Sequence, residues 1–195
     1  MKMILASSSP RRHQLLARLN YPFEIILPNV DESLVETSSA PNKYCIALAK
    51  MKAYDISLNN PNALVIGADT IVFSDNQILN KPNNHNEAKQ MLFLLSGKTH
   101  KVFTGIHLNW EEKKIHHSFS EISLVTFRQL DKKEINYYIN GYSPIDKAGS
   151  YGIQDWSALF VKDIKGCYDN IVGFPLSRFY FELKKLGINL LDSNS

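Results

Sequence analysis

A nearly uninterrupted apolar run at residues 64–73 most constrains what this chain can fold into. Apart from Gly67, Asp69 and Thr70, every residue of the run is apolar. A strand with one wet face would alternate apolar and polar side chains, whereas a continuous apolar run is typical of a strand buried on both faces. The run therefore predicts an α/β fold in which this strand lies inside the sheet.

Strand and helix patterns alternate along the rest of the chain. Residues 102–110 and 115–127 are expected to pair as antiparallel strands, so the sheet is mixed. We find no repeat and no low-complexity linker, and we expect residues 1–195 to form one domain. The other expected strands are residues 3–6, 23–27 and 159–164. One helix is expected to begin at Pro10, and four more are expected at residues 41–56, 88–95, 131–138 and 175–186.

Composition and charge exclude several classes of protein. The chain has 195 residues, 44% of them hydrophobic and 21% charged, with a net charge of +3, which is typical of a soluble globular protein. The small net charge argues against a nucleic-acid surface. No apolar run approaches the roughly 20 residues that cross a bilayer. Cys45 and Cys167, without a CxxC motif or a secretory leader, predict a reduced, cytoplasmic protein.

Residues 5–12 predict an anion site at the start of a helix. A short apolar strand precedes three serines, and Ser9 and Pro10 suit the N-cap and the first helical position. Such a turn directs backbone N–H groups and the positive end of the helix dipole at one point. Arg11 and Arg12 lie in the first turn, where the dipole disfavours cations, which indicates that they bind a ligand such as a polyphosphate. The alternative is an ordinary capped helix with two solvated arginines.

Asp69 is a lone carboxylate inside the apolar run. An ionised group in such a strand is costly unless it meets a metal ion or a cationic side chain. Catalytic groups of α/β proteins lie near the carboxyl ends of buried strands. We therefore interpret Asp69 as a functional acid; the alternative is a structural Asp that caps a neighbouring turn.

Two lysines and a second acid are candidates to meet Asp69. Lys50 and Lys52 are two residues apart on an expected helix, so they point to different faces, and one can reach inward while the other is solvated. Lys81 lies on the extended segment that returns from the hairpin after Asp69, and a cation there could reach the same pocket. Glu32 follows the second strand and could supply an oxygen ligand for Mg²⁺.

Residues 146–154 predict a ligand-binding loop. Gly149 and Gly152 permit close approach of the backbone to a ligand, and Gln154 offers a donor and an acceptor to the edge of a base. The alternative is a loop with two tight turns. The six histidines show no zinc-site spacing, and the sequence has no Walker A loop and no GxGxxG or GxSxG motif.

Five short motifs together resemble those of the Maf family of nucleoside triphosphate pyrophosphatases. They lie at residues 5–12, 67–70, 80–82, 104–105 and 146–154, in the family's order and across nearly the whole chain. The resemblance implies an elongated α/β fold with two lobes around a central cleft, similar to that of inosine triphosphate pyrophosphatases. It also implies hydrolysis of a nucleoside triphosphate to the monophosphate and pyrophosphate, and it leads us to expect a homodimer.

The resemblance further implies a role for individual residues. Asp69 falls on the family's catalytic carboxylate, and we expect Mg²⁺ or Mn²⁺ to bridge Asp69, Glu32 and the triphosphate. The positions that resemble the family's phosphate-binding residues are Ser7, Arg12, Lys52 and Lys81.

Three positions that differ between branches of the family are here Arg11, Thr70 and Gln154. They resemble the branch that acts on dTTP and UTP. One departure is Ser143, because many members have Glu before the proline of this loop. The alternatives left open are a pyrophosphatase for 7-methyl-GTP or inosine triphosphate, and a non-catalytic nucleotide-binding regulator of cell division or septum formation. An RNA-binding module is disfavoured by the near-balanced charge.

Overall fold

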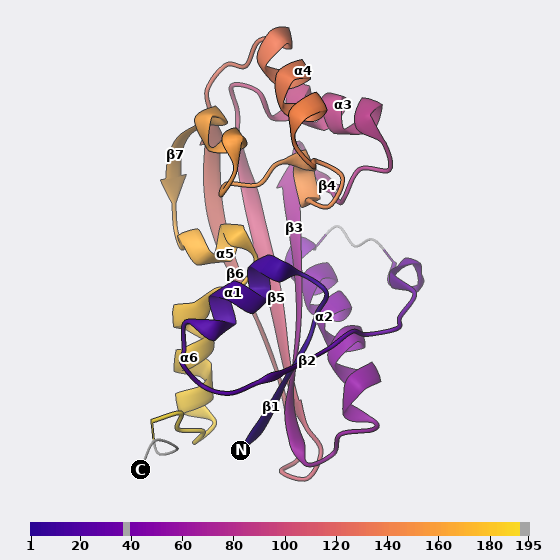
Figure 1. Ribbon diagram of the computed structural model, residues 1–195, viewed down its shortest axis with the longest axis vertical. Coiled ribbons are helices and arrows are strands. Elements are labelled where there is room, and N and C mark those ends of the chain that lie inside the picture. Colours follow the sequence, from indigo (N-terminus) through magenta and orange to yellow (C-terminus); the bar gives the residue numbers. More distant parts are fainter. Residues whose placement is uncertain (37–39, 192–195) are drawn as a thin grey trace.

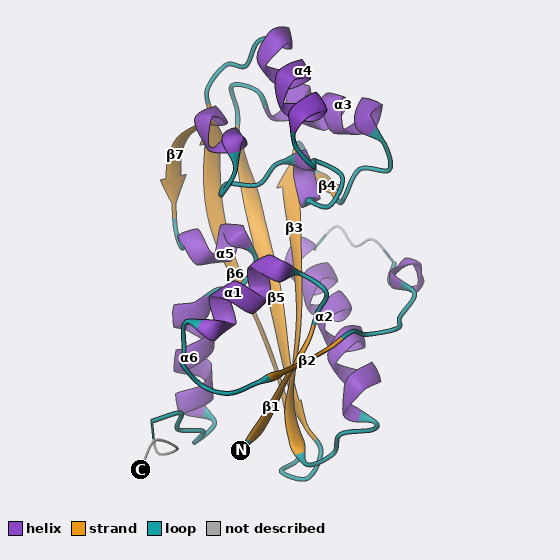
Figure 2. Ribbon diagram, in the orientation of Figure 1, coloured by secondary structure: helices purple, strands orange, loops and turns teal. Residues whose placement is uncertain are grey.

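The long apolar run forms strand β3 (Ala63–Ser74), which lies inside a seven-stranded mixed sheet (Figures 1 and 2). The computed structural model describes residues 1–36 and 40–191. The strand order is β2-β1-β3-β5-β6-β7, and β4 also pairs with β3. The predicted α/β class and mixed sheet are confirmed. The other strands are β1 (Lys2–Ala6), β2 (Glu24–Ile26), β4 (Gln77–Leu79), β5 (Thr99–Trp110), β6 (Ile115–Phe127) and β7 (Val161–Lys165).

Parallel and antiparallel pairs divide the sheet into two parts. Strand β1 pairs in parallel with β2 and β3, and every other pair is antiparallel. The predicted hairpin turn between β3 and β4 is confirmed, because Asp75 and Asn76 have φ angles of 48° and 60°. Positive φ at both central residues is the geometry whose twist matches that of two paired strands.

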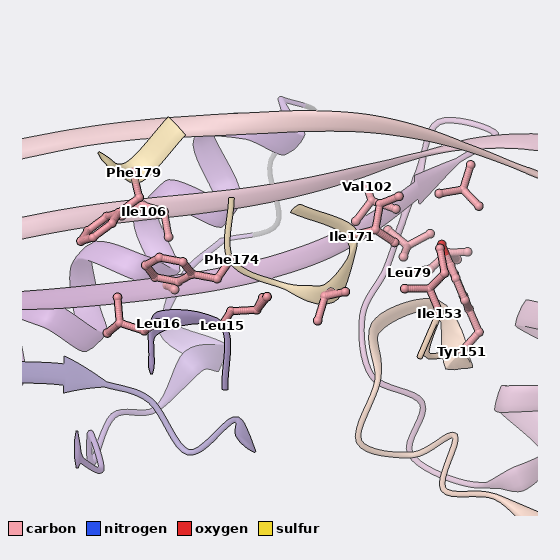
Figure 3. Packing of buried hydrophobic residues seen from close by; sticks show 14 of the residues in the cluster. Leu15, Leu16, Leu79, Val102, Ile106, Tyr151, Ile153, Ile171, Phe174 and Phe179 are labelled. Atoms are coloured by element: carbon pink, nitrogen blue, oxygen red, sulfur yellow. The ribbon is translucent and has the colours of Figure 1, made fainter. Parts of the chain in front are cut away.

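Side chains of β3 alternate between two apolar layers, so both faces of the strand are covered. Val65 and Ile71 pack against α2 (Pro41–Ser57). Ile66 and Val72 belong to the larger core on the opposite face. That core also takes side chains from α1 (Pro10–Ala17), α3 (His85–Leu95), α4 (Lys132–Gly141), α5 (Tyr168–Val172) and α6 (Leu176–Lys185). Figure 3 shows part of it, with Leu15, Leu16, Phe174 and Phe179 near Ile106.

Two glycines let α2 lie directly on the sheet. A Cβ added at Gly67 would lie 2.0 Å from the carbonyl oxygen of Ala49, and one at Gly105 would lie 2.5 Å from the backbone of Cys45. Both contacts are with helix backbone, which cannot rotate away as a side chain can. Any larger residue would therefore push the helix off the strands.

One edge of β3 is interrupted where the functional motifs converge. Strand β1 pairs with residues Ala63 to Gly67, and β4 pairs with Val72 to Ser74 along the same edge. Among the described residues, no strand pairs with this edge between them, at residues 68–71. Asp69 and Thr70 lie in this interruption, with Asp69 on the face toward α2 and Thr70 on the opposite face.

Some element boundaries differ from those expected. Helix α3 begins at His85 because the Asn84 side chain accepts the Glu87 backbone N–H. The strand expected at residues 159–164 begins at Val161, because a 3-10 helix (Trp156–Phe160) precedes it. Helix α5 was not expected. In the described part of the chain, none of the helices is both long and apolar enough to cross a membrane.

Replacement of Gly67 by Ala is expected to lower the free energy of unfolding by about 3 kcal/mol, because the new methyl group must displace the backbone of α2. Chemical denaturation measures the change. Gly141→Ala is the matched control, because a Cβ at Gly141 meets no atom within 4 Å. Equal denaturation midpoints for Gly67→Ala and the unsubstituted protein would show that the helix does not rest on this glycine.

Candidate active site

A cleft of about 250 Å³ opens at the interruption in β3. Because β1 ends there, side chains from both faces of the sheet reach the same space. All nine residues predicted from the sequence line this cleft: Ser7, Arg11, Arg12, Glu32, Lys52, Asp69, Thr70, Lys81 and Gln154. Their convergence is a finding of the structure, while their individual roles stay predictions.

A buried lysine joins two carboxylates on the α2 side of the cleft. The Lys52 ammonium lies 2.6 Å from Asp69 Oδ1 and 2.8 Å from Glu32 Oε1. Burial raises the pKa of Glu32, but the positive charges of Lys52, Lys81 and Arg12 outweigh it, so that the pKa lies below its usual value. Glu32 therefore holds its negative charge beside Asp69.

The position of Lys52 follows from the way α2 packs. Lys50 is exposed, whereas Lys52 is buried, as expected for two residues that point to different faces of the helix. Gly105 is the cross-strand neighbour of Asp69, so no side chain from β5 stands beside the carboxylate on this face. The glycine that lets the helix approach thus also leaves room for the ion pair.

Arg12 is held on the opposite side of the interrupted edge. Its Nε donates to the Gly173 carbonyl oxygen at 2.9 Å, and its Nη2 donates to the Thr70 hydroxyl at 3.0 Å. Its Nη1 lies 3.5 Å from the Ser7 hydroxyl. Burial lowers the pKa of Arg12, and the negative charge of Asp69 acts in the opposite direction. The guanidinium is thus fixed in the wall of the cleft, within the field of the acid.

The Ser7 hydroxyl retains its own proton for a ligand. Its oxygen accepts the Ser9 backbone N–H at 3.1 Å and also faces Arg12 Nη1. The hydroxyl proton is therefore free to point into the cleft, which suits a phosphate oxygen. Ser9 does occupy the N-cap position before Pro10, but its side chain makes no capping hydrogen bond.

The glycine-containing loop is tied to Arg11 through an acid that sequence reasoning left without a role. Arg11 Nη1 lies 3.1 Å from Asp146 Oδ2, and the Lys147 ammonium lies 2.7 Å from Asp146 Oδ1. Desolvation raises the pKa of Asp146, but hydrogen bonds from Lys147 and Arg11 outweigh it and lower the pKa. The pairing of Arg11 and Asp146 joins residues 135 positions apart, so no local pattern reveals it.

The two glycines of this loop make room for protein atoms. A Cβ at Gly149 would lie 2.9 Å from the Val72 side chain, and one at Gly152 would lie 2.6 Å from Cε of Lys147. The structure thus gives both glycines a packing role, against β3 and against Lys147, while Gly152 also lines the cleft and the expected close approach to a ligand stays a prediction. Gln154 and Lys81 are exposed at the cleft.

The cleft suits a polyanion that also carries an apolar group. Five cationic and three acidic side chains line it. Its apolar lining includes four side chains that are labelled in Figure 3: Val102, Tyr151, Ile153 and Ile171. In the described part of the chain, no group of three or more His, Cys, Asp or Glu side chains could hold a metal ion.

Comparison with known proteins gives both family and fold relatives. The family described as Maf-like protein matches residues 2–186. The chain is 46% identical over 189 residues to a dTTP/UTP pyrophosphatase of Bacillus cereus strain G9842, and 47% identical over 189 residues to one of Bacillus anthracis. Each alignment covers 97% of both proteins. A HAM1 protein from Coxiella burnetii shares the fold, with a TM-score of 0.52 and 15% identity over 95% of this chain and 99% of that one.

The Lys52→Met variant is expected to lose about 3 kcal/mol of unfolding free energy, because it leaves the Asp69 carboxylate buried without its partner. Denaturation at neutral pH measures the loss. Lys50→Met removes the same charge from an exposed position of the same helix and is expected to change the unfolding free energy by less than about 0.5 kcal/mol. Equal effects of the two substitutions would contradict a structural role for the buried ion pair.

Proposed function

The chain belongs to the Maf family, and from this membership we infer that it is a nucleoside triphosphate pyrophosphatase that acts on dTTP and UTP. The products are the nucleoside monophosphate and pyrophosphate. Curated relatives with this activity in their names align over nearly the full length of the chain. The observation that carries the proposal is Asp69, a buried acid on β3 that lies among the cations of one cleft.

The residues of the cleft fit a divalent cation. The Lys52 ammonium contacts both Asp69 and Glu32, which brings the two carboxylates together at the cleft, where both are lining residues. Mg²⁺ is commonly bound by one or two carboxylates together with substrate phosphate oxygens. We propose that these two residues hold Mg²⁺ or Mn²⁺ when a nucleotide is present. The ion would supply charge neutralisation at the phosphates and lower the pKa of a bound water.

The protein's own side chains divide the remaining work. Asp69 orients the attacking water and accepts its proton. The water oxygen forms a bond to the α-phosphorus, the bond from that phosphorus to the oxygen bridging to the β-phosphate breaks, and pyrophosphate leaves with the bonding electron pair. Arg12, Lys52 and Lys81 neutralise charge on the phosphates, and Ser7 donates its free hydroxyl proton. The wall at Tyr151 and Ile153 shields the nucleoside from water.

We propose that Arg11, Thr70 and Gln154 favour dTTP and UTP, and Gln154 is exposed where a base edge could meet it. Cytoplasmic placement stays a prediction, and the free thiols of Cys45 and Cys167 suit a reducing compartment. Assembly as a homodimer likewise stays a prediction from the family.

A nucleotide panel tests the proposed substrate class. With Mg²⁺ present, pyrophosphate release is expected to be fastest from dTTP and UTP, and slower from dATP, dGTP, inosine triphosphate and 7-methyl-GTP. A chelator is expected to abolish release, because the two carboxylates then have no ion to present to the phosphates. Preference for a methylated purine would reject the branch assignment, and binding without any turnover would support the regulator instead.

Asp69→Asn is expected to lower kcat by about 10³-fold, because an amide cannot accept the proton of the attacking water. Asp75→Asn is the matched control on the same strand-turn segment, where the acid is exposed and pairs with Lys98. Steady-state kinetics with dTTP and a thermal melt of each variant make the comparison. Near-normal turnover of a folded Asp69→Asn protein would remove Asp69 from the mechanism.

A further inference from the structure

Thr104 is a fully buried polar residue behind Thr70, which lines the cleft, and the proposed mechanism does not use it. It lies on β5 directly opposite Thr70 in the antiparallel register. Its hydroxyl oxygen lies 2.9 Å from the Thr70 hydroxyl oxygen and 2.9 Å from the Asn170 carbonyl oxygen. Thr104 does not line the cleft itself, so it can act on a ligand only through its neighbours.

Counting protons gives these hydrogen bonds a direction. The Asn170 carbonyl has no proton, so Thr104 must donate its single hydroxyl proton there. In the contact between the two threonines, Thr70 is then the donor and Thr104 the acceptor. The other acceptor near Thr70, the Gly173 carbonyl oxygen, is 3.5 Å away and already accepts Arg12 Nε. The Thr70 oxygen is thereby left with its lone pairs toward Arg12 Nη2.

The hydrogen-bonded series of Thr70, Thr104 and Asn170 is firmly anchored at Asn170. Asn170 is fully buried on α5. Its side-chain amide donates to the Val102 carbonyl oxygen at 3.1 Å and to the Ser123 hydroxyl at 2.9 Å. The acceptor that orients Thr104 is therefore tied to both β5 and β6. The core thus fixes which hydroxyl donates and which accepts in the whole hydrogen-bonded series.

The arrangement determines which protons Arg12 can offer to a ligand. A guanidinium has five N–H groups. Three of those on Arg12 point to Gly173, Thr70 and Ser7. One N–H on each terminal nitrogen remains, and two such groups form the fork that binds phosphate oxygens in a bidentate manner.

We propose that Thr104 is a positioning residue of the phosphate site. It fixes the Thr70 hydroxyl as an acceptor for Arg12 and so aims the free fork of Arg12 at the polyphosphate. By way of Arg12, Thr70 then also acts on the phosphates, in addition to the part in base selection proposed for it above, and its hydroxyl proton is committed to Thr104. The proposal rests on the nucleotide pyrophosphatase function inferred above.

Thr104→Val tests the proposal with a nearly isosteric side chain that lacks the hydroxyl. The probe is inorganic tripolyphosphate, titrated by calorimetry, which has phosphates but no base and needs no turnover. We expect its Kd and the KM for dTTP to rise together by about fivefold, the usual effect of one hydrogen bond. The ratio of kcat/KM between dTTP and UTP should not change. Thr104→Ser keeps the hydroxyl and should restore tripolyphosphate binding.

Two further comparisons separate positioning from a general loss of structure. Thr126→Val breaks another threonine pair, the exposed contact of 2.8 Å with Thr99, and should leave tripolyphosphate binding unchanged. Thr70→Val breaks the same chain at its other hydroxyl, and the double variant Thr70→Val/Thr104→Val should bind no more weakly than Thr70→Val alone. Full additivity in this cycle would overturn the proposal.

The remaining outcomes are equally decisive. Wild-type affinity of folded Thr104→Val for tripolyphosphate, or failure of Thr104→Ser to restore binding, would overturn the role of the hydroxyl. If nucleotide hydrolysis were absent while the tripolyphosphate results held, the pyrophosphatase function would fail and the positioning role would stand.

Discussion

The site depends on the interruption in the hydrogen-bonded edge of β3. A continuous sheet separates its two faces, and side chains such as Asp69 and Thr70, adjacent in sequence, would never share a ligand. Here the pairing of β3 with β1 ends at Gly67, and its pairing with β4 covers only Val72 to Ser74. The cluster around Lys52 on one face and the clamped Arg12 on the other therefore open onto one cleft. Because successive side chains of a strand point to opposite faces, residues from both faces of β3 line this one cleft.

The charge of Lys52 explains why two acidic side chains are tolerated in a cleft whose charged lining residues are mainly cations. Lys52 neutralises Asp69 and Glu32 at once, at distances of 2.6 and 2.8 Å. Arg12 is oriented entirely by neutral oxygen atoms, so none of its charge is cancelled by direct contact with an acid. Arg11, by contrast, is paired with Asp146. The cations of the cleft thus differ in how much charge each has left for a phosphate.

Much of the fold and the membership of the site could be predicted from local patterns. The apolar run identified β3 and its anomalous acid, and the helical spacing of Lys50 and Lys52 indicated that one would turn inward. What escaped prediction depends on distant contacts. Asp155 accepts the Ser157 N–H and starts a 3-10 turn where apolar residues suggested a strand. Helix α5 has five residues and needs tertiary packing to form. The link between Thr70 and Thr104 exists only once the register is set.

The contact between Gly149 and Val72 has a consequence for the geometry of substrates. Through it, the loop that leads to Gln154 rests on β3 three residues beyond Asp69, a spacing of about 10 Å along the strand. With the roles proposed above for Asp69 and Gln154, this fixed spacing restricts the length of the molecules that can reach both residues at once.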